Sequence, residues 1–222
     1  MNRKIIIISL YLAVFLFTNN ASVWADTKKE YYSNGALKKI IPYRGDEIHG
    51  TMKLYLKDGT LAQKIYYEEG QKTAVEWFHP DGSLAAKRKF EDGKAAGIER
   101  SYYNTGEISQ ETPFIDGKTE GLVKYYYKDG GLYTTRPYKK GKADGIEKIY
   151  DKKGNLIQEI PYKNGVVEGM GKSYTPEGGY IEIPCKDGVK QGIGRHYDSD
   201  NNLIAEYVYK DNKLVETKKV GQ

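Results

Sequence analysis

Six basic residues recur at one fixed place along the chain and are the strongest candidates for binding chemistry. Each lies six residues before a turn glycine, or before Asn201 in the last case. The six are Lys53, Arg100, Lys124, Lys148, Lys172 and Arg195. A tyrosine follows two residues after most of them, as at Tyr102, Tyr126 and Tyr150. Residues two apart share one face of a strand, so this spacing predicts a basic ladder beside a column of tyrosines.

Two interpretations of this basic ladder stay open. The long stems of lysine and arginine can cover an apolar stripe while their charged heads reach water, and the ladder is then a packing feature. The alternative is a surface for an extended acidic partner: another protein, an acidic envelope polymer or an anionic lipid surface. Tyrosine and arginine are also enriched among the residues that dominate protein interfaces.

The other reactive side chains form no recognisable site. The single cysteine, Cys185, replaces an aromatic residue found in sister units, so we interpret it as a small apolar filler, with intermolecular pairing as the alternative. His49, His79 and His196 lie in different units without metal-type spacing, and we expect them at the surface. No nucleophile motif, phosphate loop or carboxylate pair is present. The sequence therefore predicts a non-enzyme without metal or cofactor.

Residues 1–25 have the pattern of a secretory signal peptide. Arg3 and Lys4 precede an apolar run from Ile5 to Phe17, and small residues follow, ending at Ala25. An uncleaved anchor is the alternative, but the run is short for a membrane span. We expect export to the periplasm, the cell surface or the medium. With 35 basic and 30 acidic residues, the charge is too balanced to suggest nucleic acid.

The part of the chain that must position the ladder, residues 26–222, consists of about eight units of roughly 24 residues. A first turn glycine recurs every 23 or 24 residues, at Gly35, Gly59, Gly82, Gly106, Gly130, Gly154 and Gly178, with Asn201 in the eighth place. A second turn glycine and, in most units, a third one follow. Regular spacing of this kind is typical of a repeat array.

Each unit reads as a β-hairpin. An aromatic residue stands four before the first turn glycine, as at Tyr126, and a second aromatic column stands before the second turn, as at Tyr162. We expect the hairpins to form one elongated, twisted, single-layer antiparallel sheet, all-β, with the first column packed as a continuous stripe. Prolines such as Pro161 are expected at strand ends. The end units are expected to differ, with a shortened second strand in the first and a charged tail in the last.

The pattern G-x-x-x-x-Y, turn glycine, L, then P-Y/F-x-x-G resembles the bacterial MORN repeat variant over about residues 30–215. This resemblance implies hairpins laid side by side in one sheet. Some bacterial proteins of this variant are classed as antitoxin or immunity proteins of the YwqK type, and others are surface or secreted proteins. We therefore expect a monomeric, extracytoplasmic scaffold that binds a protein or an envelope polymer, with a toxin-neutralising protein as the alternative.

Overall fold

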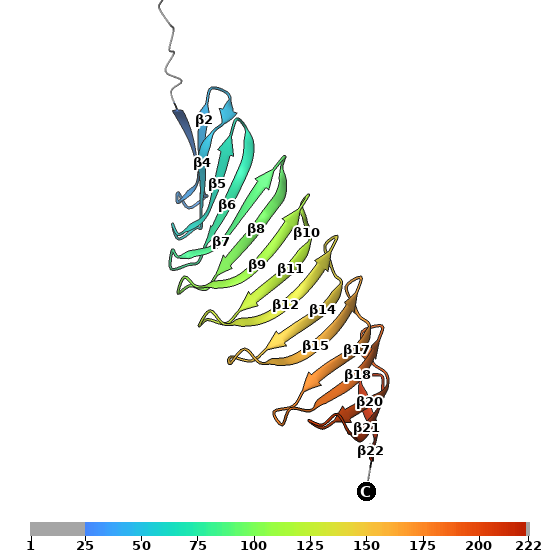
Figure 1. Ribbon diagram of the computed structural model, residues 1–222. Helices are drawn as coiled ribbons and strands as arrows, with labels where there is room; N and C mark the ends of the chain where they lie inside the picture. Colours follow the sequence, from blue (N-terminus) through green and yellow to red (C-terminus); the bar gives the residue numbers. More distant parts are fainter. Residues whose placement is uncertain (1–24, 221–222) are drawn as a thin grey trace, which may run out of the picture.

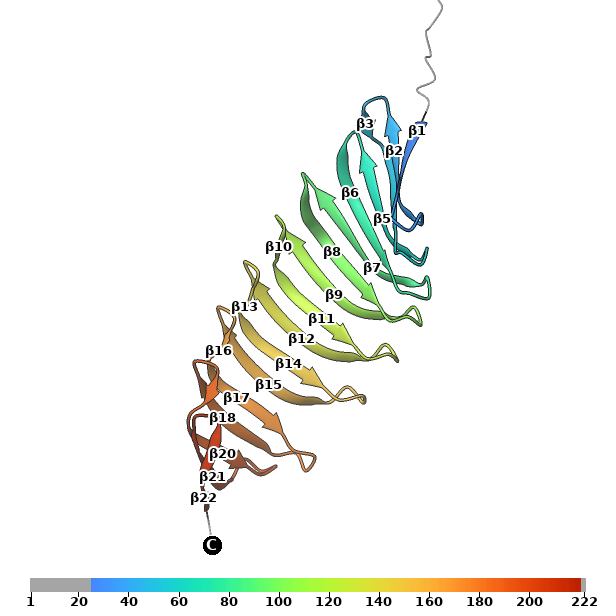
Figure 2. The same cartoon turned by 180° about the vertical axis from the view of Figure 1, so that it is seen from behind.

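The computed structural model describes residues 25–220, which form one open sheet of 22 antiparallel strands. The expected signal peptide lies outside the described residues apart from Ala25, the first residue of β1 (Ala25–Tyr31). Figures 1 and 2 show a long, twisted ribbon of hairpins that follow one another in chain order, with the N-terminal and C-terminal units at opposite ends. No helix occurs in the described part of the chain, and hence none that could span a membrane. The predicted fold class is confirmed.

Eight hairpins, five strands of two residues each and one additional strand at the C-terminal end make up this sheet. The remaining strands are β2 (Leu37–Arg44), β3 (Glu47–Ile48), β4 (Gly50–Tyr55), β5 (Leu61–Glu68), β6 (Gln71–Phe78), β7 (Leu84–Glu91), β8 (Lys94–Tyr102), β9 (Ile108–Ile115), β10 (Lys118–Thr119), β11 (Gly121–Tyr126), β12 (Leu132–Lys139), β13 (Lys142–Ala143), β14 (Gly145–Tyr150), β15 (Leu156–Lys163), β16 (Val166–Val167), β17 (Gly169–Tyr174), β18 (Tyr180–Lys186), β19 (Val189–Lys190), β20 (Gly192–Tyr197), β21 (Leu203–Lys210) and β22 (Lys213–Lys219). The charged tail expected after the last unit is the edge strand β22.

The two turns of each unit have different geometries. At the first turn, the amide of Tyr32 donates to the carbonyl of Ala36 and that of Gly35 donates back to Tyr32, with Gly35 at φ 81°. This is a tight turn with a bulge, in which glycine takes the left-handed position. At the second turn, both central residues have positive φ, as at Asn164 and Gly165. That pattern is the I′ hairpin turn, whose twist matches the strands it joins.

The first unit was expected to have a shortened second strand, and that expectation is wrong. Strand β2 has eight residues, as do β9 and β15. The unit differs in its turn, which reads Gly45–Asp46 where other units have their glycine second, and only Gly45 has positive φ. Glycine at the first central position alone is typical of a II′ turn, so the strand length is kept.

Proline and the third glycine form a pair across neighbouring strands, and the prolines do not mark strand ends. Pro137 lies within β12, and a Cβ added to Gly145 would stand 2.7 Å from its ring. The same contact recurs between Pro161 and Gly169. There too the hydrogen-bonded pairing of the strands is interrupted, between β16 and β17. Proline has no amide hydrogen to donate to the next strand, which explains why these partner strands are split. Strands β6 and β8, which follow units without this proline, are continuous.

The buried core is a row on one face of the sheet, which we call the core face. Ile41, Met52, Val75 and Val123 are 9 % exposed or less, and Val123 is the most buried large side chain at 2 %. The first aromatic column does not form this core, because Tyr126 is only half-buried. The predicted continuous tyrosine stripe is therefore wrong: the residue three positions before the first-column aromatic lies in the core row instead, as at Met52, Val75 and Val123.

Candidate binding face

The basic ladder is part of a longer row of charged residues that crosses the sheet strand by strand. Register partners link Lys53 to Lys64, Lys64 to Glu76, and Glu76 to Lys87. The row continues through Arg100, Glu111, Lys124, Thr135, Lys148, Glu159, Lys172, Glu182, Arg195, Glu206 and Lys218. We call it the charge row and the side of the sheet that carries it the ladder face. All six predicted basic residues lie in it.

Most of the predicted cations are paired with a carboxylate in the charge row. Arg100 Nε lies 3.0 Å from Glu111, Lys172 Nζ lies 3.2 Å from Glu182, and Arg195 Nε lies 3.4 Å from Glu206. Lys148 Nζ stands 3.7 Å from Glu159. The predicted ladder of free positive charge is therefore corrected to a row of mostly alternating signs. The signal for it was in the sequence, since a glutamate follows Arg100, Lys148 and Arg195 at a distance of 11 residues.

Three places break this alternation. Thr135 stands between Lys124 and Lys148, where the unit before it and the three units after it place a glutamate. Two lysines on either side of a neutral residue leave an excess of positive charge in the middle of the charge row. Nearer the N-terminal end, Lys53 stands beside Lys64 and Lys87 beside Arg100.

The predicted tyrosines lie beside the charge row and connect neighbouring units. Glu111 accepts hydrogen bonds from Arg100 Nε at 3.0 Å and from the Tyr126 hydroxyl at 3.0 Å, which places both on the ladder face. Burial raises the pKa of Glu111, but these two hydrogen bonds outweigh burial and leave the pKa below its ordinary value. The carbonyl of Tyr102 accepts a hydrogen bond from His79 Nε2 at 3.0 Å, and the carbonyl of Tyr150 accepts one from the Tyr127 hydroxyl at 2.8 Å.

The donors in these last two contacts, His79 and Tyr127, belong to a further column of residues, each directly after a first-column aromatic, that was not predicted. The hydroxyls of Tyr32, Tyr103 and Tyr127 donate to the carbonyl of the residue 23 positions later, at 2.6–2.8 Å. Each bond ties one first turn to the next hairpin. His79 takes the same place in its unit and is half-buried. His49 and His196 are half-buried and hydrogen-bonded as well, so all three histidines are partly exposed and each makes a hydrogen bond.

An exposed aliphatic column runs along the ladder face, two residues before the basic residue of each unit. These residues are 44–51 % exposed, although their side chains are apolar. The column consists of Ile98, Leu122, Ile146, Met170 and Ile193. Four of them pair with a proline on the next strand, as Ile146 does with Pro161. This column was not predicted, because the exposure of an apolar residue does not follow from its type alone.

The core face carries charged residues of its own, held in ion pairs. Arg136 lies 2.7 Å from Glu147, whose side chain is 5 % exposed, and Arg88 pairs with Glu99. Both guanidinium groups also lie over aromatic rings, that of Arg136 5.3 Å from the centre of Tyr162. The bond to Glu147 raises the pKa of Arg136 above its already high ordinary value. Residues 25–220 bring together no group of three His, Cys, Asp or Glu that could hold a metal ion.

Comparison with known proteins agrees with this geometry. The description "MORN repeat variant" matches residues 27–44, 48–71, 96–116, 119–140 and 143–164. These five segments are similar to MORN repeat variants. The structure shows hairpins of the same kind outside the matched segments, through β21.

Similarity to other proteins is limited. No curated protein matches the chain. Among solved structures, accessory secretory protein 1, 2 and 3 of Streptococcus pneumoniae is 21 % identical with a TM-score of 0.33, over 45 % of this chain and 19 % of that one. A TarM mutant of S. aureus is 14 % identical with a TM-score of 0.26, over 64 % and 22 %. The chain thus spans less than a quarter of either protein.

Proposed function

We propose that this chain is an exported, non-enzymatic binding scaffold whose ladder face contacts another protein. The observation that supports this most is the exposed aliphatic column, five apolar residues in consecutive units beside the charge row. Soluble proteins seldom expose contiguous apolar surface of this kind unless it binds something. Mixed apolar and charged chemistry suits a protein interface, in which apolar contacts supply affinity and charges fix the register.

The alternating charge row favours a protein over an acidic polymer or an anionic lipid surface. Glu111, Glu159, Glu182 and Glu206 would repel a polyanion at every second strand. A protein partner can meet both signs with complementary charges. An acidic polymer would find positive charge without an intervening carboxylate only at short places: at Lys53 and Lys64, at Lys87 and Arg100, and around Thr135. The export proposal rests on residues 1–25 and their signal-peptide pattern.

The test is a comparison of the mature chain with a variant in which Leu122 and Ile146 are both changed to Asn. We expect chemical cross-linking in the native envelope to capture a protein with the wild type and several-fold less with the variant. Leu214→Asn is the control, because Leu214 is 53 % exposed but lies on the edge strand outside the column. Equal capture by all three would refute the proposal. If the captured protein is a toxin whose gene neighbours the gene of this chain, the scaffold is an immunity protein.

A further inference from the structure

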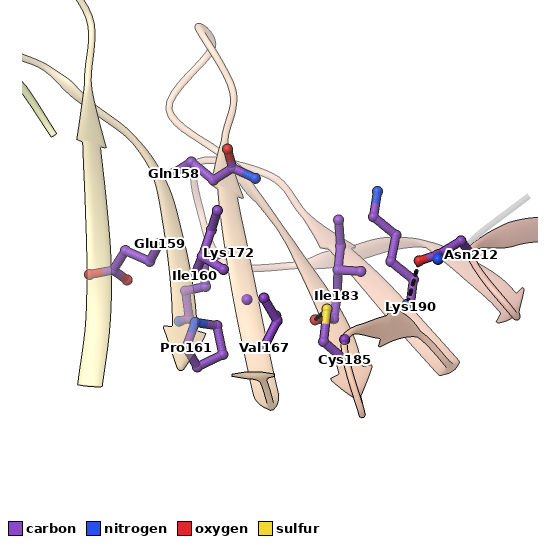
Figure 3. A pocket seen from close by; sticks show the side chains of 12 residues that line it. Gln158, Glu159, Ile160, Pro161, Val167, Lys172, Ile183, Cys185, Lys190 and Asn212 are labelled. Atoms are coloured by element: carbon purple, nitrogen blue, oxygen red, sulfur yellow. Dashed lines mark hydrogen bonds between the residues drawn. The ribbon is translucent and has the colours of Figure 1, made fainter. Parts of the chain in front are cut away.

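Cys185 interrupts the second aromatic column, and a hollow lies beside it on the core face. In seven of the eight units this column holds a tyrosine or phenylalanine: Tyr43, Tyr67, Phe90, Phe114, Tyr138, Tyr162 and Tyr209. At Cys185 a small side chain stands in the same place. Figure 3 shows Val167, Ile183 and Cys185 around the hollow, which has a volume of about 200 Å³.

The neighbouring unit shows what fills this space elsewhere. Gly194 pairs with Tyr207, two residues from Tyr209, and a Cβ added to Gly194 would lie 3.1 Å from the ring of Tyr209. The ring of Tyr209 therefore lies on this glycine. Gly171 is the equivalent residue one unit earlier, and it stands in the same relation to Cys185 through its partner Ile183. The three atoms nearest to a Cβ at Gly171 are the carbonyl oxygens of Glu159 and Ile183 and Cδ of Pro161, and none of the described residues that line the hollow is aromatic.

The walls of the hollow suit an apolar ring. Ile160 and Ile183 lie in the core row on either side of Gly171, and Val167 and Pro161 complete the apolar lining. Burial raises the pKa of the Cys185 thiol, which is therefore protonated at neutral pH and behaves as an apolar group. Lys190 is the register partner of Cys185 and lines the rim; its ammonium group lies 5.6 Å from the centre of the Tyr209 ring, which is the kind of cation–aromatic contact that an inserted ring could share.

We propose that this hollow is a socket that receives one aromatic side chain, tyrosine or phenylalanine, from a partner protein. The inserted ring lies above Gly171, as the ring of Tyr209 lies above Gly194. Its volume suits one ring, since an engineered cavity of about 150 Å³ accepts benzene, whereas pockets for larger small molecules begin at about 300 Å³. Aromatic anchors in such pockets dominate many protein interfaces. Cys185 and Ile183 lie on the opposite face from the charge row, although Glu159 and Lys172 of that row also border the hollow, so the socket and the proposed function are tested with separate variants.

The first test uses p-cresol, the free side chain of tyrosine, as the probe. We expect saturable shifts in the methyl NMR signals of Ile183 and Val167 in the wild type and in Cys185→Ala, which keeps the hollow open. Cys185→Tyr restores the repeat pattern and should fill the socket, so p-cresol should bind at least tenfold more weakly, while the melting temperature rises. Cys185→Phe serves as a second filled variant. Equal p-cresol binding by open and filled variants would overturn the proposal.

The second test asks whether a protein supplies the ring. We expect cross-linking in the native envelope to yield one protein with the wild type and with Cys185→Ala, and at least fivefold less of it with Cys185→Tyr. Unchanged capture by Cys185→Tyr would overturn the socket as a protein-binding site. The Leu122→Asn and Ile146→Asn changes lie on the opposite face and should leave p-cresol binding unaltered, so failure of the socket and failure of the ladder face are distinguishable.

Discussion

The guanidinium group of Arg136 donates a 2.7 Å hydrogen bond to the carboxylate of Glu147, on the buried side of a sheet that is one layer thick. Glu147→Gln removes the negative charge and leaves Arg136 among the rings of the core face. We expect a loss of about 3 kcal/mol in unfolding free energy, the low end for a broken buried pair, because Arg136 is still 30 % exposed. Urea denaturation measures it.

The matched control for this pair is Glu206→Gln, which breaks the Arg195–Glu206 pair of the charge row. Both partners of that pair are more exposed, at 42 % and 26 %, so we expect a loss below about 1 kcal/mol. Equal losses in the two variants would show that burial of Glu147 does not set the strength of its pair. Replacing Arg136 and Glu147 together by Met and Leu should restore much of the stability.

A second prediction concerns Gly145 and the proline it faces. Gly97 has positive φ but open space around it, so Gly97→Ala should cost about 1–2 kcal/mol in backbone strain alone. Gly145→Ala adds a methyl group 2.7 Å from the Pro137 ring and should cost about 1–3 kcal/mol more through overpacking. Adding Pro137→Ala to Gly145→Ala should recover most of that difference. If it recovers nothing, the two residues are not coupled through this contact.

A third prediction is a loss of stability in acid that depends on Glu76. Burial raises the pKa of Glu76, but the hydrogen bonds from Lys87 and Tyr66 lower it by more than burial raises it. The resulting pKa lies below the ordinary 4.5. A lowered folded-state pKa contributes stability that is present above pH 4.5 and is lost as pH falls through the lowered value. The difference in unfolding free energy between wild type and Glu76→Gln should therefore shrink as pH falls from 6 to 3.

The same contact has a counterpart at alkaline pH. Burial and the hydrogen bond to Glu76 raise the pKa of Tyr66 to about 12, so its contribution is full below pH 10 and is lost as pH rises through 12. Ultraviolet titration should show one tyrosine that ionises near pH 12 in the wild type and at lower pH in Glu76→Gln. Identical titrations would mean that Glu76 does not act on Tyr66.

A fourth prediction separates binding from packing in the charge row. Changing Lys124, Lys148 and Lys172 to Gln keeps most of each stem, and the ion pairs lost are exposed, so we expect stability to fall by less than about 1 kcal/mol. Binding of the captured partner should weaken and depend less on salt, because exposed charges are screened at physiological ionic strength. An unchanged salt dependence would show that these lysines only cover the sheet.

The hairpins and their turns could be predicted from the sequence because the chain itself specifies them. Gly154 and Gly165 mark places where the backbone needs positive φ, and the regular spacing of such residues defines the unit. Which face forms the core could not be predicted, since both carry apolar residues: Leu122 and Val123 are neighbours, yet they are 45 % and 2 % exposed. Only the curvature and register of the assembled sheet separate them.

The charge row was half predicted for a similar reason. Its six predicted basic members recur at one offset, with Glu76 as the exception, but Glu111 belongs to the other strand of its hairpin, beyond a turn and a bulge at Ser101 and Tyr102. The register across that bulge decides which residue stands opposite Arg100. The hollow at Cys185 was not predicted, because the sequence shows the missing ring at 185 but not the glycine at 171 beneath it.

The Arg100–Glu111 and Lys148–Glu159 contacts each involve only adjacent strands, so the length of the ladder face is adjustable. Deleting the 24 residues from Leu122 to Gly145 would bring Lys148 next to Glu111 in the place of Lys124 and leave the remaining contacts in phase. Duplication of one unit would extend the face by two strand widths, about 10 Å, without redesign of any contact. The number of repeat units can therefore be adjusted so that the ladder face matches the length of its binding partner.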